Sequence, residues 1–464
     1  MKIELAKTEI IHFIGIGGIG MSGLALIMKS KGFNVQGSDV LIGKNIERLK
    51  KDKIKVNIKH TKKNIKSATI VVISSAIKKN NPELIEAKRK HLPIYKRGEM
   101  LANIVSLTKN IVVTGSHGKT TTTSLVAKIL STAKLDPTII NGGVINSIKS
   151  NAKLGKGEWA VLEADESDGS FLKLPINYSI VTNIDVEHLD YYKNYENLKQ
   201  SFIKFINKTP PIGKSIICID SLDLRKILKK VTTKNYLTYG FNTSANYQIL
   251  NVKYKITNTN FDLQIKGSGS KKILIKNINL NLIGKHNVLN ATAAIAVCLN
   301  LGIKFNIIKK AMKNFSGVQR RLTKIFIKNT REFYDDYAHH PTEISAVLEG
   351  IRKVYKNRKI VSIFQPHRYS RIKDLKKKFS SSFFLSDTVI LCPMYAAGEK
   401  KDKNYDSFKF AKLIKKNSNV QVVLIKDQSE LQKYLQKNLI SNEIVIGMGA
   451  GTISKWMYEL KNNL

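Results

Sequence analysis

The sequence predicts an α/β protein of about three domains, and three observations lead to this prediction. The chain has 464 residues, which is too long for one hydrophobic core and corresponds to roughly three domains at about 150 residues each. Short apolar, β-branched runs alternate with helical stretches, as is typical of parallel sheets covered by helices. Two glycine-rich turns, at 15–20 and 115–118, each follow such a run and lead into a helical segment.

The first region, residues 10 to about 105, contains strand candidates at 10–16, 34–37, 70–74 and 92–95. Its glycine turn, GIGGIG at 15–20, matches the GxGxxG pattern, and Asp39 follows about twenty residues later. Such a turn binds NAD or FAD in many enzymes. A glycine turn at a helix N-terminus accepts any diphosphate, however, including that of a UDP-sugar. Both interpretations stay open on these residues.

A second region begins near Thr108 and contains the motif GSHGKTTT at 115–122, between the strand candidate 111–114 and a helix. Glycines let backbone N–H groups turn toward phosphate oxygens, Lys119 can neutralise phosphate, and the Thr120 hydroxyl can ligate Mg²⁺. We therefore expect an ATP or GTP site. The loop is shorter than the general GxxxxGK[ST] pattern, because Val113 stands where the first glycine is expected. A tight strand-to-helix turn is the alternative.

Acidic residues follow the next two strand candidates, 159–163 and 179–183. EADESD occupies 163–168 and NIDVEHLD occupies 183–190, which adds His188. Ligands of open α/β sheets bind at the carboxyl ends of the strands, and carboxylates near phosphates recruit Mg²⁺. The sequence therefore predicts a magnesium site there, with an exposed acidic turn as the alternative.

The pattern of apolar and polar residues changes after about residue 245. Residues 245–283 alternate apolar and polar side chains, which predicts an antiparallel addition to the second region, closed by a helix over 288–301. A third region begins near Leu322, with strand candidates at 361–364, 388–392, 420–425 and 443–446. Four polar clusters stand at segment borders, each also explicable as helix caps or ion pairs: GKHNVLN (284–290), GVQRR (317–321), DDYAHHPTE (335–343) and FQPHRYSR (364–371).

Composition limits which other classes of protein the chain could belong to. The net charge of +43 suggests nucleic acid or an anionic membrane as a partner. The lysines are, however, spread along the whole chain among abundant Ile and Asn, without a basic-aromatic block or zinc-ligand spacing, so we expect neither partner. Three cysteines, each in or beside an apolar run, indicate buried free thiols in a reducing compartment. The uncharged stretch 10–28 carries five glycines, which argues against a membrane anchor. We expect a soluble, cytoplasmic protein.

In their order along the chain, these motifs resemble those of one family, the ATP-dependent Mur ligases of peptidoglycan synthesis. The resemblance also rests on GSD (37–39), SSAI (74–77), RGEML (97–101), AAGE (396–399) and GAGTI (449–453). It implies an N-terminal Rossmann-like UDP-sugar domain (1–107), a central P-loop ATPase-type domain with a mixed sheet (108–322) and a C-terminal Rossmann-like amino-acid domain (323–464). EADESD, DDYAHHPTE and HRYSR resemble the branch of the family that adds alanine.

The resemblance also implies a reaction. The lactyl carboxylate of UDP-N-acetylmuramate would attack the γ-phosphate of ATP, and the amine of L-alanine would then attack the resulting acyl phosphate, with Mg²⁺ assisting. Two departures from the family pattern, Ser116 in place of Thr and Glu187 in place of Asp, keep the functional group. The chain would act as a monomer or homodimer. A recycling ligase that attaches a peptide to the same sugar nucleotide, and an NAD-dependent oxidoreductase, are the alternatives.

Residue roles carried over from the resemblance fall into five groups. ATP would be bound by Gly115, Ser116, His117, Gly118, Lys119, Thr120, Thr121, His286, Asn290 and Arg321, and Mg²⁺ by Thr120, Glu166 and His188. The UDP-sugar would be bound by Gly15, Gly17, Gly18, Gly20, Asp39, His60, Ser74 and Ser75. L-Alanine and the acyl phosphate would be bound by Tyr337, His339, Arg368 and Arg371. The catalytic set would be Lys119, His188, His339, Arg368 and Arg371.

Overall fold

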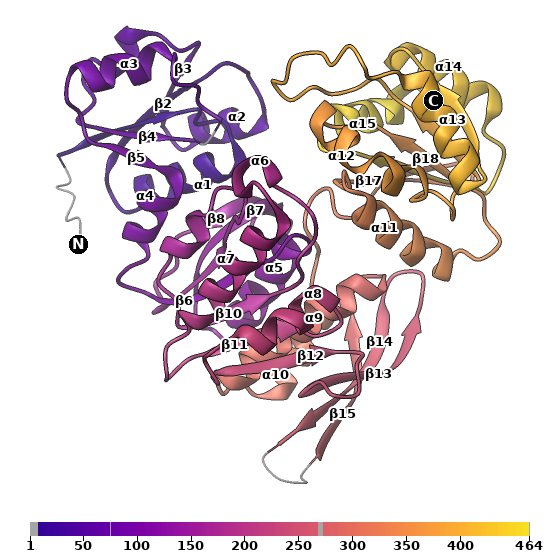
Figure 1. Ribbon diagram of the computed structural model, residues 1–464, viewed down its shortest axis with the longest axis horizontal. Coiled ribbons are helices and arrows are strands. Elements are labelled where there is room, and N and C mark those ends of the chain that lie inside the picture. The colour runs from indigo at the N-terminus through magenta and orange to yellow at the C-terminus, as the bar shows by residue number, and fades with distance from the viewer. Residues whose placement is uncertain (1–7, 75, 268–271, 464) are drawn as a thin grey trace. The chain divides into compact units, whose positions relative to one another are not determined.

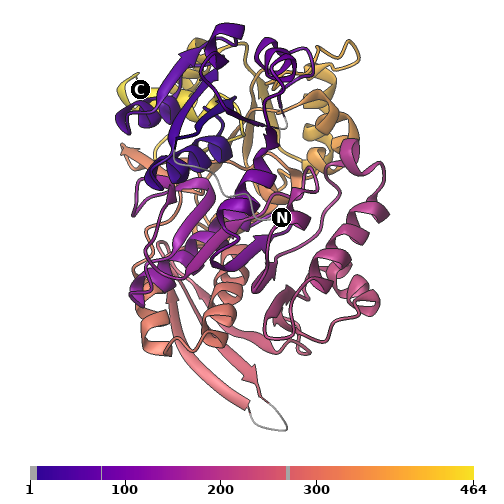
Figure 2. The same ribbon diagram turned by 90° about the vertical axis from the view of Figure 1, so that its left-hand side faces the viewer.

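The computed structural model of the chain describes residues 8–74, 76–267 and 272–463, and it contains three β-sheets (Figures 1 and 2). Two compact units form. The first consists of residues 1–252, 260–281 and 289–316, and the second of 253–259, 282–288 and 317–464. The first unit therefore holds the glycine turn and the phosphate loop predicted from the sequence.

The N-terminal sheet has five strands in the order β3-β2-β1-β4-β5, and all neighbouring pairs are parallel. The order changes direction at β1, so the carboxyl ends of β1 and its neighbours form the edge where such sheets bind ligands. The elements are β1 (Ile10–Ile14), α1 (Ile19–Ser30), β2 (Asn34–Asp39), α2 (Lys44–Lys51), β3 (Lys55–Ile58), β4 (Ile70–Ile73), α3 (Pro82–Arg89), β5 (Ile94–Lys96) and α4 (Arg97–Ile104).

The central sheet has ten strands, in the order β15-β14-β13-β12-β11-β10-β6-β9-β7-β8. The strands from β7 to β13 in this order pair in parallel, and β8 is antiparallel to β7. Its strands are β6 (Lys109–Thr114), β7 (Thr138–Ile145), β8 (Ser150–Lys153), β9 (Trp159–Glu163), β10 (Tyr178–Val181), β11 (Lys214–Cys218), β12 (Tyr236–Gly240), β13 (Tyr247–Tyr254), β14 (Thr259–Lys266) and β15 (Lys272–Leu280).

Strands β13 to β15 extend from the central sheet as a ribbon (Figures 1 and 2). Only residues 255–258 link β13 to β14, and the Lys255 N–H donates to the Asn258 carbonyl (2.8 Å) within this tight connection. The helices of this region are α5 (Lys119–Thr132), the 3₁₀ helix η2 (Ser170–Lys173), α6 (Leu189–Tyr192), α7 (Tyr195–Asn207), α8 (Leu222–Ile227), the 3₁₀ helix η3 (Leu228–Lys230), α9 (Lys285–Asn300) and α10 (Phe305–Lys313). Helix α9 begins three residues before the predicted start at 288.

The C-terminal sheet has six strands, in the order β16-β17-β21-β18-β19-β20, parallel except for the antiparallel pair β16–β17. Alternate residues of β18 belong to two different core clusters, Phe364 to one and Ile363 to the other, so both faces of this strand are buried. The elements are β16 (Thr323–Lys328), β17 (Arg331–Asp336), α11 (Pro341–Val354), β18 (Ile360–Phe364), α12 (Tyr369–Ser380), β19 (Thr388–Leu391), α13 (Ser407–Ser418), β20 (Gln421–Leu424), α14 (Gln428–Asn438), β21 (Ile444–Met448) and α15 (Ile453–Asn463).

Two predictions from composition can be compared with this fold. Cys218, Cys298 and Cys392 are buried free thiols, as predicted, and burial raises the pKa of each thiol. Within the described ranges, none of the helices has both the length and the apolar character required to cross a bilayer.

Candidate active site

The phosphate loop connects the buried strand β6 to helix α5 and is fixed by the segment that follows β10. The Ser116 N–H donates to the Asn183 carbonyl (3.1 Å), and the His117 N–H donates to Asn183 Oδ1 (2.8 Å). The Thr182 hydroxyl donates to the His117 carbonyl (2.7 Å). Gly115 has φ +129°, and a Cβ there would lie 2.2 Å from Thr182 Oγ1, so only glycine fits.

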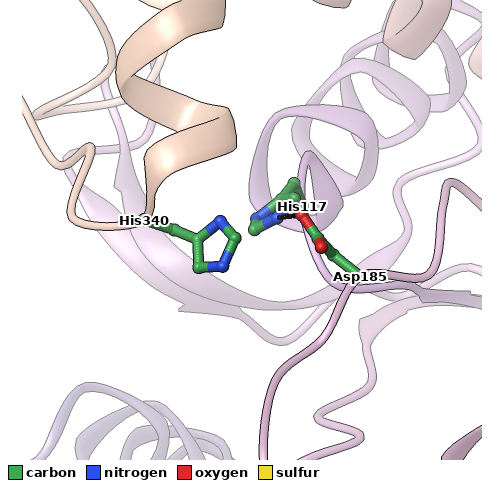
Figure 3. A group of neighbouring side chains, drawn as sticks. All are labelled: His117, Asp185 and His340. Carbon is green, nitrogen blue, oxygen red and sulfur yellow. Dashed lines mark hydrogen bonds and ion pairs between the residues drawn. The ribbon is translucent and has the colours of Figure 1, made fainter. Parts of the chain in front are cut away.

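His117 and Asp185 form a second link between the loop and the same segment (Figure 3). His117 Nε2 lies 3.2 Å from Asp185 Oδ2. The Asp185 N–H in turn donates to Ser116 Oγ at 2.8 Å. These contacts orient the loop ahead of the first turn of α5, where backbone N–H groups lack intrahelical partners and can bind an anion.

Lys119, the first residue of α5, is the cation of the loop. Its Nζ donates to the Gly115 carbonyl (2.6 Å) and pairs with both oxygens of Glu166, at 3.0 and 2.9 Å. Burial alone would lower the pKa of Lys119, but Glu166, Asp165 and Glu163 together raise it well above its usual range. Lys119 is therefore charged at neutral pH.

Thr120 contacts a carboxylate that the predicted ligand set omits. Its hydroxyl donates to Glu163 Oε1 (3.0 Å), and Glu163 Oε2 accepts from the Gly142 N–H (2.6 Å). Glu163 is the last residue of β9, next to β6 in the sheet. Sequence reasoning placed it in the acidic cluster but not among the ligands. Its position at the end of a strand, directly before the turn, was the signal that could have identified it.

Glu166, Glu187 and His188 come together in a second acidic group, and one ligand atom from each lies within 4.8 Å of the others. His188 Nε2 is 3.5 Å from both Glu166 Oε1 and Glu187 Oε2. Burial lowers the pKa of His188, but the two carboxylates outweigh it, and the net pKa is raised above the usual value. The structure thus brings together two of the three predicted metal ligands and adds Glu187.

The remaining predicted ATP contacts lie in different units. Asn290, on α9 in the first unit, has its Oδ1 beside Gly118, where a Cβ would approach it to 2.5 Å. Thr121 is buried in the first turn of α5. His286 and Arg321 belong to the second unit. Burial, with the charge of Arg321, lowers the pKa of His286 to about 4, so this ring is neutral at pH 7.

The glycine turn after β1 is stabilised by Asp39. Its Oδ2 accepts from the Gly17 N–H (2.8 Å), and its Oδ1 accepts from the N–H groups of Val40 (2.7 Å) and Leu41 (3.2 Å). The turn at Gly15 has φ +81° and ends β1 at Ile14, two residues before the predicted end. Asp39 therefore shapes the turn itself, in addition to any contact with a ribose.

His60 belongs to a polar network that extends into the N-terminal core. Its Nδ1 lies 2.9 Å from Ser38 Oγ, and the Ser38 hydroxyl donates to Glu83 Oε2 (2.5 Å). The buried Glu83 also contacts His12 Nε2 at 3.2 Å. Burial raises the pKa of Glu83, but hydrogen bonds from His12, Ser38 and Asn64 lower it overall. Ser74 Oγ accepts from the Ala76 N–H (3.1 Å), and Ser75 lies outside the described residues.

In the second unit, aromatic rings gather at the carboxyl ends of β17, β18 and β19. His339 packs edge-on against Tyr337 (5.0 Å between centroids) and against His367 (5.7 Å), and His367 stacks on Tyr395 (5.5 Å). Burial lowers the pKa of His339 to about 3 and that of His367 to about 4. The predicted set did not include His367 and Tyr395; His367 directly precedes Arg368 in the FQPHRYSR motif.

Several arginine side chains lie close to these rings. Arg371 Nη1 lies 3.1 Å from His367 Nδ1, and the guanidinium carbons of Arg320 and Arg321 lie 4.8 and 5.4 Å from the ring centre of Tyr337. Arg368 has φ +69°, unusual for a side chain of this size, and its N–H donates to the Tyr395 carbonyl (2.9 Å). The structure thus places Tyr337, His339 and Arg371 at one edge of this sheet, with Arg368 beginning the helix there.

Comparison with known proteins gives a consistent result along the chain. Residues 10–109 match the catalytic domain of the Mur ligase family, 113–298 match the Mur ligase middle domain, and 320–451 match the glutamate ligase domain of Mur ligases.

Curated relatives and solved structures agree. The chain is 64% identical to a UDP-N-acetylmuramate–L-alanine ligase of Pelagibacter ubique over 99% of both chains, and 42% identical to one of Bartonella tribocorum over 100% of this chain and 98% of the other. The crystal structure of UDP-N-acetylmuramate–alanine ligase from Thermotoga maritima matches with a TM-score of 0.83 and 28% identity, covering 97% and 98% of the two chains. A murein peptide ligase from Psychrobacter arcticus matches with a TM-score of 0.73 at 22% identity, over 98% of each chain, which shows a shared fold.

Proposed function

The chain belongs to the Mur ligase family, and from this premise we propose that it joins L-alanine to the lactyl carboxylate of UDP-N-acetylmuramate at the expense of ATP, in peptidoglycan synthesis. The observation that carries this proposal is the near full-length identity of 64% to a ligase named for these two substrates. The arrangement of the first unit supports it, because a glycine turn for a diphosphate and a phosphate loop with acidic groups lie in one compact body.

Two bond exchanges make up the reaction. A carboxylate oxygen of the sugar nucleotide forms a bond to the γ-phosphorus while the bond to the departing ADP breaks, giving an acyl phosphate. The neutral amine of alanine then attacks the acyl carbon, loses a proton, and inorganic phosphate leaves. Neither step needs a nucleophile from the protein. The task of the protein is therefore to position the substrates and to neutralise their charge.

Lys119 and the backbone of the phosphate loop perform this task for ATP. The buried ammonium of Lys119 stands at the N-terminus of α5, where the helix dipole adds to its charge. Together they would stabilise the negative charge that spreads over the γ-phosphoryl oxygens during transfer. The contacts of Gly115, Ser116 and His117 with residues 182–185 hold the loop in this shape before ATP binds.

The acidic groups near Lys119 fit Mg²⁺. This ion prefers hard oxygen donors, and Thr120 with Glu163 supplies a hydroxyl and a carboxylate in contact. Glu166, Glu187 and His188 form the second group. We propose Glu163 as a ligand in addition to the predicted Thr120, Glu166 and His188. When bound, Mg²⁺ neutralises charge on the phosphates.

The aromatic and arginine cluster of the second unit fits the amino acid and the acyl phosphate. His339 and His367 are neutral at pH 7, so they can act as hydrogen-bond partners that carry no charge. Arg371, beside His367, and Arg368 supply the cations that a carboxylate or phosphate requires. A monomer or homodimer stays a prediction.

Phosphate release in the presence of ATP, Mg²⁺, UDP-N-acetylmuramate and L-alanine tests the proposal. We expect release that depends on both the sugar nucleotide and alanine, with UDP-N-acetylmuramoyl-L-alanine identified by mass. A tripeptide beginning with L-alanine, supplied as the acceptor instead, should react far more slowly. Preference for the tripeptide would favour the recycling ligase, and folded protein without alanine-dependent release would refute the proposal.

A further inference from the structure

Arg97 lies at the glycine turn of the N-terminal sheet, although none of the predicted roles includes it. It is the first residue of α4, directly after the edge strand β5. A Cβ on Gly20, in the first turn of α1, would lie 3.2 Å from both Cδ and Nη1 of Arg97. The guanidinium therefore packs against the start of the helix whose N-terminus faces the expected diphosphate.

The same guanidinium reaches the acidic cluster of the central sheet. Arg97 Nη2 donates to Asp165 Oδ2 at 3.3 Å. Asp165 lies between Glu163 and Glu166 in the chain. Burial raises the pKa of Asp165, but Arg97 and then Lys119 lower it overall, so this carboxylate interacts with both cations. Arg97 thus stands between the glycine turn and the group of residues that surrounds Lys119.

Helix α4 holds this position firmly. A Cβ on Gly98 would lie 2.4 Å from the Ser170 Cβ, so the helix is packed directly against η2. Glu99 pairs with Lys173 on η2 (2.5 Å) and accepts from the Lys96 N–H (2.9 Å), which caps the helix. Because Gly98 and Glu99 are fixed, the backbone of Arg97 is fixed as well.

We propose that Arg97 binds the lactyl carboxylate of the sugar nucleotide and positions it beside the γ-phosphate of ATP. This inference rests on the proposed function. Arg97 contacts both the first turn of α1, which follows the glycine turn, and Asp165 of the acidic cluster, so it lies between the expected sites of the diphosphate and of the γ-phosphate. The reaction brings two anions together, and a cation between them offsets their repulsion most where water is largely excluded. The Arg97 side chain is 19% exposed.

The chemistry of the side chain fits this role. A guanidinium carries five N–H donors in a planar fork that matches a carboxylate, and the contact with Asp165 uses one of them. The competing explanation is that Arg97 only links the two sheets through Asp165. The chain offers a matched control for that explanation, since Lys173–Glu99 is an ion pair across the same contact between α4 and η2.

Calorimetric measurement of ligand binding, without ATP or Mg²⁺, distinguishes the carboxylate-binding role of Arg97 from a purely structural link. The ligands are UDP-N-acetylmuramate, and UDP-N-acetylglucosamine and UDP, which share the diphosphate but lack the lactyl group. For Arg97→Gln we expect at least a tenfold loss of affinity for UDP-N-acetylmuramate and less than a twofold change for the other two. Arg97→Lys should retain part of the affinity, and Lys173→Ala should leave all three ligands unchanged.

Two results would overturn the proposal. Equal losses for all three ligands would assign Arg97 to the diphosphate or to a structural link, and unchanged binding of UDP-N-acetylmuramate would remove it from the site. In turnover, Arg97→Lys should raise the KM for UDP-N-acetylmuramate and leave the KM for ATP unchanged. Failure of the wild-type protein to release phosphate would refute the proposed function, whereas the binding comparison tests Arg97 independently.

Discussion

Lys119 is a largely buried cation held between loop carbonyls and the carboxylate of Glu166. We expect Lys119→Ala to lower kcat at least about a hundredfold, because a preorganised group that stabilises transition-state charge is typically worth that much. Affinity for UDP-N-acetylmuramate should stay unchanged, since the glycine turn belongs to a different sheet of the same unit. Phosphate release and calorimetry provide the two measurements.

Lys128→Ala is the matched control, because Lys128 lies on the same helix, four residues before the helix ends at Thr132. The Lys128→Ala variant should retain the wild-type turnover and the wild-type affinity for UDP-N-acetylmuramate. If Lys119→Ala abolished sugar-nucleotide binding as well, the assignment of the two ligands to separate sheets would be wrong.

The role of a residue was predictable from sequence where a motif fixes the backbone. It was less predictable where a side chain could contact any of several neighbouring groups. The pattern GKT identified Lys119 and Thr120, but several carboxylates follow β9, and spacing alone cannot say which of them Thr120 contacts. The structure pairs it with Glu163. Asp39 was predicted to contact a ligand, and the structure adds three backbone hydrogen bonds that only the folded turn creates.

The strand, loop and helix formed by β6, residues 115–118 and α5 depend on Gly115. An alanine there would combine φ +129° with a Cβ 2.2 Å from Thr182 Oγ1 and 2.9 Å from the Asn183 carbonyl. We expect Gly115→Ala to lower the free energy of unfolding by about 1–3 kcal/mol through backbone strain, and more if the segment 182–185 shifts. Urea denaturation measures this, and ATP affinity should fall too.

Gly32→Ala gives the comparison for strain alone, because Gly32 has φ +90° but nothing lies within 4 Å of the added Cβ. It should cost less stability and leave ATP affinity unchanged. Equal effects of the two substitutions would show that the contact between the loop and the segment after β10 contributes nothing.

Several strands that are apolar on both faces were predicted from sequence, and several that carry exposed or charged residues were missed. β6, β18 and β21 are buried along almost their whole length and stand out as β-branched runs. β3 and β16 lie at sheet edges and have only exposed and half-buried positions. Their lysines interrupt the apolar pattern that would predict a strand. β17 is largely buried, yet its two aspartates and Glu332 made REFYDD look like a polar segment.

Over the whole chain, the order of the motifs indicated the three-domain α/β fold and the family, both of which the comparisons confirm. The net charge of +43 did not indicate the family, whereas the motifs did. Long-range contacts such as that between Arg97 and Asp165 were not predictable, since they join motifs 68 residues apart that no local pattern relates.

The dependence of stability on pH follows from two partly buried histidines of the second unit, His339 and His367. Burial lowers the pKa of His339 to about 3 and of His367 to about 4, against an ordinary value of 6.5 in the unfolded chain. Between pH 6.5 and about 4 the unfolded chain therefore binds protons that the folded chain does not, and stability falls as the pH falls. Each histidine contributes at most about 1.4 kcal/mol per pH unit in this window.

Replacing these histidines should remove that dependence. We expect the double variant His339→Asn and His367→Asn to lose stability at every pH through altered packing, but to show a shallower slope of unfolding free energy between pH 6.5 and 5 than the wild type. The slopes of the two proteins should coincide between pH 7.5 and 8.5, where neither state protonates these rings. Urea denaturation at each pH measures both slopes, and identical slopes below pH 6.5 would mean that the rings are protonated in the folded protein.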